Sequence, residues 1–510
     1  MPGNRTSAEG VADGNSVELH SQQNGHRPAD TAAAPLASHE PTPAAIRDDF
    51  SSSDSHERRG KSAASPVKVV DGEPFRSASL SDGDKSGEGV QDEKRRNIFM
   101  RIVNTIIPNG GLLSGAVNLA SVTLGAGIMS IPASFNTSGM IMAVFYLIVI
   151  TALTVFSITL LAQAMEKTGI YSFEGLARAL FGRGGDIIVA VLMWILCFGG
   201  SIGYVIAVGD IFKPILDHPG VPDFLQTMNG RRCIMSGIWL LFMLPLVLPK
   251  RINSLRYVSA VGVCFILLFV VCVIYHSIAY GLKDGIRDDL VMVRPGNAAV
   301  SGLSIFCFSY LCQVNVGRIV LENTNSSIRK ITLQAGVSCA ICGVLYFLTG
   351  FFGYAEFGPA LQGNILDKYN PYQSPVFFVV FIGLIVKLCA AFSLNMLACR
   401  TALFQVVHWD VDTLPYWKHT VVSVPIAIGA LILGLFVPDI GLVFGLAGAF
   451  SGGFIGFVFP ALYVMYSGNW NLKTVGIWYY LGTYFLLLCG VISIVFGTGS
   501  SIYEAVIQYG

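Results

Sequence analysis

The stretch SVTLGAGIMSIP, residues 121–132, interrupts an apolar run with two glycines, an alanine between them and a proline five residues later. Glycine has no side chain and proline has no backbone N–H, so both weaken a helix at this point. Unpaired backbone groups at membrane depth are tolerated only where they are buried in protein or line a cavity. We therefore predict that a membrane helix unwinds at Gly125, Ala126 and Gly127 and exposes its backbone to a ligand. The alternative is a small-residue surface for close helix packing.

The composition divides the chain into two parts. The 510 residues are 53% hydrophobic and 13% charged, with a mean hydropathy of +0.61. Residues 1–96 nevertheless hold 12 Lys and Arg, 16 Asp and Glu and two aromatic residues. Such a segment cannot bury enough apolar surface to offset its conformational entropy. We predict a disordered cytoplasmic tail over 1–96 and a transmembrane domain over 97–510, in an all-α polytopic membrane protein.

Eleven apolar runs have about the length that a membrane-crossing helix needs. They cover about residues 112–135, 138–165, 185–212, 233–249, 257–281, 298–321, 331–357, 375–403, 420–437, 440–466 and 475–498. The connecting segments carry 15 basic residues on the side of the N-terminus and 7 on the other, which places the N-terminus in the cytoplasm. The C-terminal SIYEAVIQYG, 501–510, is then expected outside. SFEGLARALFG, 172–182, is either a short interfacial helix or a plain loop.

The sixth run contains a second candidate break, FCFSYLCQVNVGRIVLENTN, residues 306–325. Its apolar half ends at Leu311, and polar groups from Gln313 to Asn323 fill what should be the inner half of the span. Five spans separate this break from the first. Many transporters are built from inverted repeats with broken helices at matching positions. The layout therefore predicts a five-plus-five inverted repeat with spans 1 and 6 unwound, although span 6 could also end early and continue as a loop.

Other function classes find little support. Four of the eight histidines lie in residues 1–96, and no His, Asp or Glu cluster within the spans has metal-ligand spacing. We also find no nucleophile motif and no Gly-rich phosphate loop in a soluble domain. The sequence therefore predicts no enzyme activity, no metal or cofactor and no nucleic-acid partner.

Three segments resemble the amino acid/auxin permease family. They are LSGAVNLASVTLGAGIMSIPASF at 113–135, LVFGLAGAFSGGFIGFVFPALYVM at 442–465 and GYVIAVGD at 203–210, the last most like the kinetoplastid parasite members. The resemblance covers about residues 97–498. It implies an amino acid transporter that works by alternating access around a midplane site, with a small-molecule amino acid and the lipid bilayer as its partners.

The resemblance also implies a substrate site at the two breaks. The substrate carboxylate is expected at the backbone amides of Gly125, Ala126, Gly127 and Ile128. The ammonium is expected at carbonyls between Phe308 and Leu311. Four side chains are expected to face the same cavity and to select the substrate: Tyr204, Tyr310, Gln313 and Ser451. For the two tyrosines the alternative is an interior aromatic residue whose hydroxyl is hydrogen-bonded.

Coupling and substrate charge depend on a few buried polar residues. Lys387 falls near mid-bilayer in span 8, where a lysine costs free energy unless it is paired or lies in a water-filled cavity. Sodium-coupled relatives carry an asparagine where this chain has Ser121, and span 8 offers few hydroxyls, among them Ser393. We therefore expect uptake without sodium, by proton coupling or uniport, with the ammonium in the place of a bound cation or releasing a proton. The alternative is a structural lysine that is paired with backbone carbonyls or with a carboxylate from another span. Glu322 is the carboxylate to test for cationic substrates, although it could pair with Arg318, and neutral amino acids are favoured.

Two further alternatives concern the role and the location. The same fold can serve as a membrane amino acid sensor that signals through its N-terminal tail. Residues 1–96 contain no strong amphipathic stretch for gripping a partner, so a carrier is favoured. The plasma membrane is the expected location, and a vacuolar or lysosomal membrane is the alternative.

Overall fold

The computed structural model describes residues 111–249, 255–283, 285–323, 327–407, 409 and 414–509, and these form helices and connecting segments without a strand. The expected tail over 1–96 lies outside the described residues. So does the start of the expected transmembrane domain, from residue 97 to residue 110.

Within the described chain, ten helices are long and apolar enough to cross a membrane, and a bent helix pair makes an eleventh span. The bent pair is span 1, formed by α2 (Leu112–Thr123) and α3 (Gly127–Ser138) at 65° to each other. Spans 2 and 3 are α4 (Met140–Thr168) and α6 (Arg183–Leu216). Span 4 consists of α8 (Met228–Ile238), η1 (Trp239–Met243) and α9 (Leu244–Val247), and span 5 consists of α10 (Leu255–His276) and η2 (Ser277–Gly281).

The later spans begin with a second broken helix. Span 6 consists of α11 (Asn297–Ser309), the turn η3 (Gln313–Asn315) and α12 (Val316–Glu322). Spans 7, 8 and 9 are α13 (Ile328–Phe357), α14 (Val376–Val406) and α15 (Tyr416–Phe436). Span 10 consists of α16 (Ile440–Ala447), η6 (Gly448–Gly452), η7 (Phe454–Val458) and α17 (Phe459–Tyr466). Span 11 consists of α19 (Ile477–Ile492), η8 (Ser493–Gly497) and α20 (Thr498–Tyr509).

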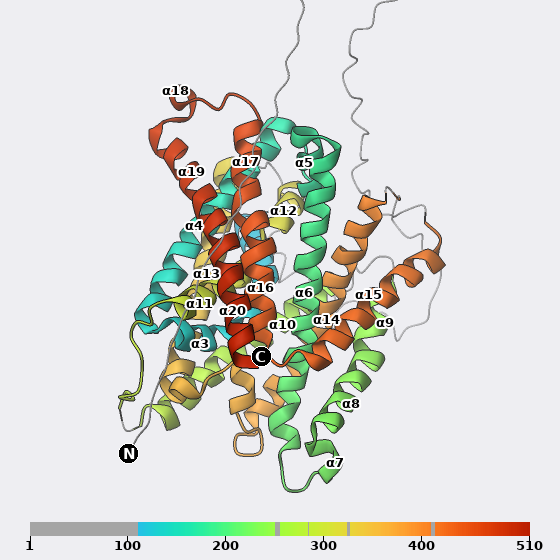
Figure 1. The fold of residues 1–510 in the computed structure, drawn as a ribbon, viewed down its shortest axis with the longest axis vertical. Coiled ribbons are helices and arrows are strands. Elements are labelled where there is room, and N and C mark those ends of the chain that lie inside the picture. Colours follow the sequence, from blue (N-terminus) through green and yellow to red (C-terminus); the bar gives the residue numbers. More distant parts are fainter. Residues whose placement is uncertain are drawn as a thin grey trace, which may run out of the picture. The chain divides into compact units, whose positions relative to one another are not determined.

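The arrangement is the five-plus-five fold, because the first and sixth spans are both interrupted and each opens a set of five. Helix α3 packs against α11, and α6 runs along α14, so the two sets interlock (Figure 1). Helix α13 contacts both halves of span 1. The prediction of two broken spans is confirmed. Span 6 does not end early, since α12 continues as a helix beyond the break.

The predictions for the segment 172–182 and for the end of the last span have different outcomes. The short helix, as opposed to a plain loop, is confirmed as α5 (Phe173–Phe181), where the Ser172 hydroxyl accepts a hydrogen bond from the Gly175 amide at 3.1 Å and caps the first turn. The last span, expected to end at 498, instead continues as α20 to Tyr509. The segment 501–510, expected outside the last span, is thus helical up to Tyr509. Glu504 lines a cavity, whereas Val506 on the same helix is exposed.

Glycines in span 10 allow a close approach to the break in span 6. A side chain at Gly448 would collide with the backbone and Cβ of Phe308, and one at Gly456 would lie 3.1 Å from a methyl carbon of Leu311. Phe308 also stacks on Phe444 of α16, with ring centroids 4.1 Å apart. Span 10 thus supports the broken segment of span 6 from one side.

Candidate functional site

The two breaks face each other inside the helix bundle. A side-chain carbon at Gly127 would lie 2.5 Å from the Oγ of Ser309 and 3.1 Å from its Cα. Gly127 opens α3, and Ser309 ends α11. Tyr204 of α6 approaches the first break from another side, since its hydroxyl would lie 3.4 Å from a side-chain carbon at Gly125. The glycines therefore permit contacts that a larger residue would block.

Three half-helix ends meet at this place. Helices α2 and α11 end here with their carbonyls, and α3 begins here with its amides. A helix carries partial positive charge at its N-terminus and partial negative charge at its C-terminus. The Tyr346 hydroxyl of α13 bridges the two C-terminal ends, at 3.0 Å from the Thr123 carbonyl oxygen and 2.8 Å from that of Ser309. The arrangement can accept an anionic group at α3 and a cationic group at the ends of α2 and α11.

The backbone groups expected at the substrate are not all available. The amide of Gly125 donates to the Thr123 carbonyl at 2.9 Å. Ala126, Gly127 and Ile128 stand at the start of α3, where amides have no acceptor within the helix. Three of the four expected amides therefore fit the role, and that of Gly125 does not.

The expected carbonyls of span 6 are also partly engaged. The Phe308 carbonyl accepts the amide of Leu311 at 3.1 Å, and that of Ser309 accepts the Tyr346 hydroxyl. The break itself extends over Tyr310, Leu311 and Cys312, between the end of α11 and the turn η3.

The four expected side chains differ in their surroundings. Tyr204 is 9% exposed and stands at the first break. Tyr310 is buried with its hydroxyl accepting from Thr151 of α4 at 2.8 Å, which is the interior-aromatic alternative. Gln313 folds back, accepting from the Cys312 amide at 3.0 Å and donating to the Gly456 carbonyl at 3.4 Å. Ser451 is fully buried, and its hydroxyl has no hydrogen-bond partner among the described residues.

Lys387 is buried, and its ammonium reaches the C-terminal turn of α2. Its Nζ donates to the Ser121 carbonyl at 3.3 Å, and only 5% of the residue is exposed. The side chain passes Gly262 of α10, where an added carbon would lie 2.9 Å from the lysine Cβ. Ser121 contributes its backbone carbonyl to this contact, which is also the pairing expected of a structural lysine. A cation at the carbonyl end of a half-helix is favourable.

The two remaining expected residues lie apart from the breaks. Glu322 is at the end of α12, where it accepts from Asn118 at 3.1 Å and from Arg318 at 3.2 Å, with its side chain 37% exposed. The Ser393 hydroxyl donates to the Cys389 carbonyl of its own helix at 2.9 Å. The pairing of Glu322 with Arg318 that the sequence suggested is confirmed.

The comparisons with known proteins decide the family. The family model of the transmembrane amino acid transporter protein matches residues 108–503. The chain belongs to this family. It is therefore a multi-pass membrane protein of a family of transporters. The expected resemblance is confirmed at the level of the family.

Individual members of this transporter family are distant in sequence. Vacuolar amino acid transporter 5 of Schizosaccharomyces pombe is 24% identical over 71% of this chain and 86% of the relative. Amino acid transporter AVT6E of Arabidopsis thaliana is 25% identical over 83% of this chain and 91% of its own.

A manganese transporter of Eremococcus coleocola, solved by crystallography, has a similar fold with a TM-score of 0.51 at 14% identity, covering 78% of this chain and 87% of that one.

Tyr346 is the site residue that sequence reasoning missed. It is one of two tyrosines in the long apolar helix α13, and its hydroxyl contacts carbonyls 223 and 37 residues away in the chain. A buried tyrosine usually finds a hydrogen-bond partner, which is the one available signal. That signal does not identify the partner.

Removal of this hydroxyl tests how much the bridge contributes. We expect Tyr346→Phe to lower uptake by about fivefold, because one hydrogen bond of about 1 kcal/mol is lost and the ends of α2 and α11 are no longer tied. Initial uptake rates at matched membrane expression measure the effect. Tyr275→Phe is the matched control, since Tyr275 is 69% exposed on α10. Equal rates for the wild type and Tyr346→Phe would show that the bridge contributes nothing to transport.

Proposed function

We propose that this family member carries amino acids across its membrane by alternating access, with the substrate bound where the breaks of spans 1 and 6 meet. The observation that carries the proposal is the meeting of unlike half-helix ends at Gly127 and Ser309. The amides of α3 suit a carboxylate, and the carbonyl ends of α2 and α11 suit an ammonium. A free α-amino acid has both groups on one carbon atom.

The contact between Lys387 and the Ser121 carbonyl supports transport without sodium. The ammonium already supplies a positive charge to the end of α2. Proton coupling and uniport both agree with this arrangement. The cycle would then move Lys387 between contact with α2 and contact with water, and a proton-coupled carrier would release its proton in the second state.

Transport by purified protein separates a carrier from a sensor. We expect the full chain, reconstituted in liposomes, to take up labelled neutral amino acids above protein-free liposomes. A sensor would bind an amino acid without flux. A panel that includes alanine, glutamine, leucine and arginine gives the substrate range in the same experiment. Binding with no flux for any member would favour the sensor.

The position of Glu322 supports neutral substrates. Its carboxylate lies at the inner end of α12 and is held by Asn118 and Arg318. We expect Glu322→Gln to leave the ratio of arginine to alanine uptake unchanged, measured side by side in the same cells. Selective loss of arginine uptake would show that this carboxylate selects cationic substrates.

Two relatives are named vacuolar amino acid transporters, from Schizosaccharomyces pombe and Saccharomyces cerevisiae. These names support the vacuolar or lysosomal alternative for this chain beside the plasma membrane. Fluorescence microscopy of the tagged full chain in its own cells distinguishes the two locations.

A further inference from the structure

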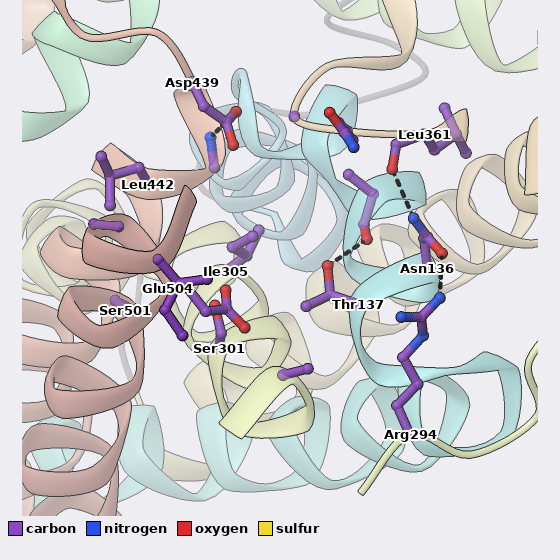
Figure 2. Close-up of a pocket in the computed structure, with 17 residues that line it drawn as sticks. Asn136, Thr137, Arg294, Ser301, Ile305, Leu361, Asp439, Leu442, Ser501 and Glu504 are labelled. Atoms are coloured by element: carbon purple, nitrogen blue, oxygen red, sulfur yellow. Dashed lines mark hydrogen bonds between the residues drawn. The ribbon is translucent and has the colours of Figure 1, made fainter. Parts of the chain in front are cut away.

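A cavity of about 410 Å³ is lined by α3, α11, α16 and α20 and by the segment at 361–363. Figure 2 shows its lining, with Asn136 and Thr137 on α3, Ser301 on α11 and Glu504 on α20. Asn136 is nine residues beyond Gly127, or about 14 Å along the axis of α3. The cavity therefore lies toward the outer side of the site proposed above, in the orientation expected from the loop charges, and its lining extends inward to Ile305, four residues before Ser309. Its volume suits a small ligand.

Opposite charges stand on opposite walls of this outer cavity. Arg294 lies on one side, and Glu504 and Asp439 lie across from it, with Thr137 between (Figure 2). Among the described residues, none of these three charged groups forms an ion pair. One guanidinium against two carboxylates leaves a formal charge of −1 on the lining.

Several polar groups of the outer cavity lack a full set of partners. An Nη atom of Arg294 donates to Asn136 at 3.3 Å, but its buried Nε has no hydrogen-bond partner among the described residues. The Ser501 hydroxyl is also unpartnered there, in a residue that is 3% exposed. Asp439 accepts the Gly441 amide at 2.9 Å, which leaves further acceptor capacity on its carboxylate. Buried polar groups without partners are costly, so a bound ligand that meets them is favoured.

We propose that the outer cavity is a second binding site for a free α-amino acid, in which Arg294 takes the carboxylate and Glu504 with Asp439 takes the ammonium. This rests on the proposed function, because the ligand is the carrier's own substrate class on its way to the breaks. A simple anion would leave both carboxylates unpaired, and a simple cation would leave Arg294 unpaired. The negative lining disfavours amino acids with acidic side chains.

Binding stoichiometry tests the outer site. Full-length protein in lipid nanodiscs is titrated with tritiated L-alanine, L-glutamine and L-arginine, and the expected result is two sites per chain for at least one of them. In Arg294→Gln and Glu504→Gln, one site is weakened by about tenfold or more, because a hydrogen bond to a charged group is lost. In Gly127→Leu the outer site alone remains. Asp439→Asn is a second variant that preserves the helix cap, since asparagine caps as well as aspartate.

The matched control is Arg287→Gln, which lies in the same outer loop and pairs with Asp289 at 2.6 Å on the exposed surface. It retains both sites. If the wild type takes up amino acids in liposomes but has one binding site per chain, the outer site is overturned and the proposed function stands. The same holds if there are two sites and Glu504→Gln leaves both unchanged. The absence of both uptake and binding for all three amino acids overturns the proposed function together with it.

Discussion

Replacing Gly127 with leucine abolishes amino acid uptake and leaves the protein in the membrane. The leucine side chain would need the space that Ser309 occupies, since its first carbon alone would lie 2.5 Å from the serine Oγ and 3.1 Å from the Cα. The hydroxyl can rotate away, but the backbone of α11 cannot. The two broken spans must separate, and the proposed contact between the substrate and the amides of α3 is lost. Leucine is more apolar than glycine, so insertion of span 1 is not impaired.

Radiolabelled uptake and surface labelling measure the two effects in the same cells. We expect uptake within the background and surface protein near the wild-type amount. Gly237→Leu is the matched control, because nothing lies within 4 Å of a carbon added there on α8. Gly127→Ala should give an intermediate loss, since alanine adds only the first carbon. Normal uptake by Gly127→Leu at normal expression would exclude a substrate site at this break.

The spans and their breaks could be predicted from the sequence because both are local properties. A membrane span is a run of apolar residues, and the break at Gly125–Gly127 is marked by residues that weaken helices. The short cap at Ser172 is local too. The end of span 11 lies later than predicted, because the apolar run ends near residue 498 whereas the helix continues to Tyr509 with residues such as Glu504 that line a cavity.

The contacts between spans could not be predicted in the same way. Tyr346 reaches both breaks only because α13 packs beside span 1 and span 6, and no local pattern encodes that rotation of the helix. The Gly125 amide was expected to meet the substrate, but the turn after α2 uses it for the Thr123 carbonyl. Arg294 and Glu504 are 210 residues apart (504 − 294) and share a cavity only in the folded chain. Sequence reasoning thus located the breaks but not their partners.

Lys387→Met removes transport or its dependence on pH. Uptake by the wild type, and any uptake that the variant retains, is independent of sodium. The reason is the position of the ammonium, which is buried and donates to the Ser121 carbonyl at the end of α2. A lysine at mid-bilayer costs about 2.5–3.5 kcal/mol on insertion scales, so its presence favours a function. Methionine has a similar shape and no charge. It leaves the carbonyl end of the half-helix without a cation.

A set of three variants separates charge from proton release. Arginine keeps a fixed positive charge because it does not lose its proton in proteins. If the ammonium only replaces a bound cation, Lys387→Arg retains uptake wherever the longer side chain is accommodated, and Lys387→Met does not. If Lys387 exchanges a proton during the cycle, both variants lose pH-driven uptake. Lys473→Met is the matched control, since Lys473 is exposed on α18 (Leu472–Val475).

The neighbour of Lys387 supplies an independent test of the same contact. Gly262 gives the lysine its path to α2, and an added carbon would lie 2.9 Å from the lysine Cβ. We therefore expect Gly262→Val to displace the ammonium from Ser121 and to reproduce the phenotype of Lys387→Met while Lys387 itself is unchanged. Uptake is measured in liposomes at fixed pH and membrane potential, with sodium replaced by choline. A steep rise of wild-type uptake with sodium would show that a sodium ion, and not this lysine, completes the end of α2.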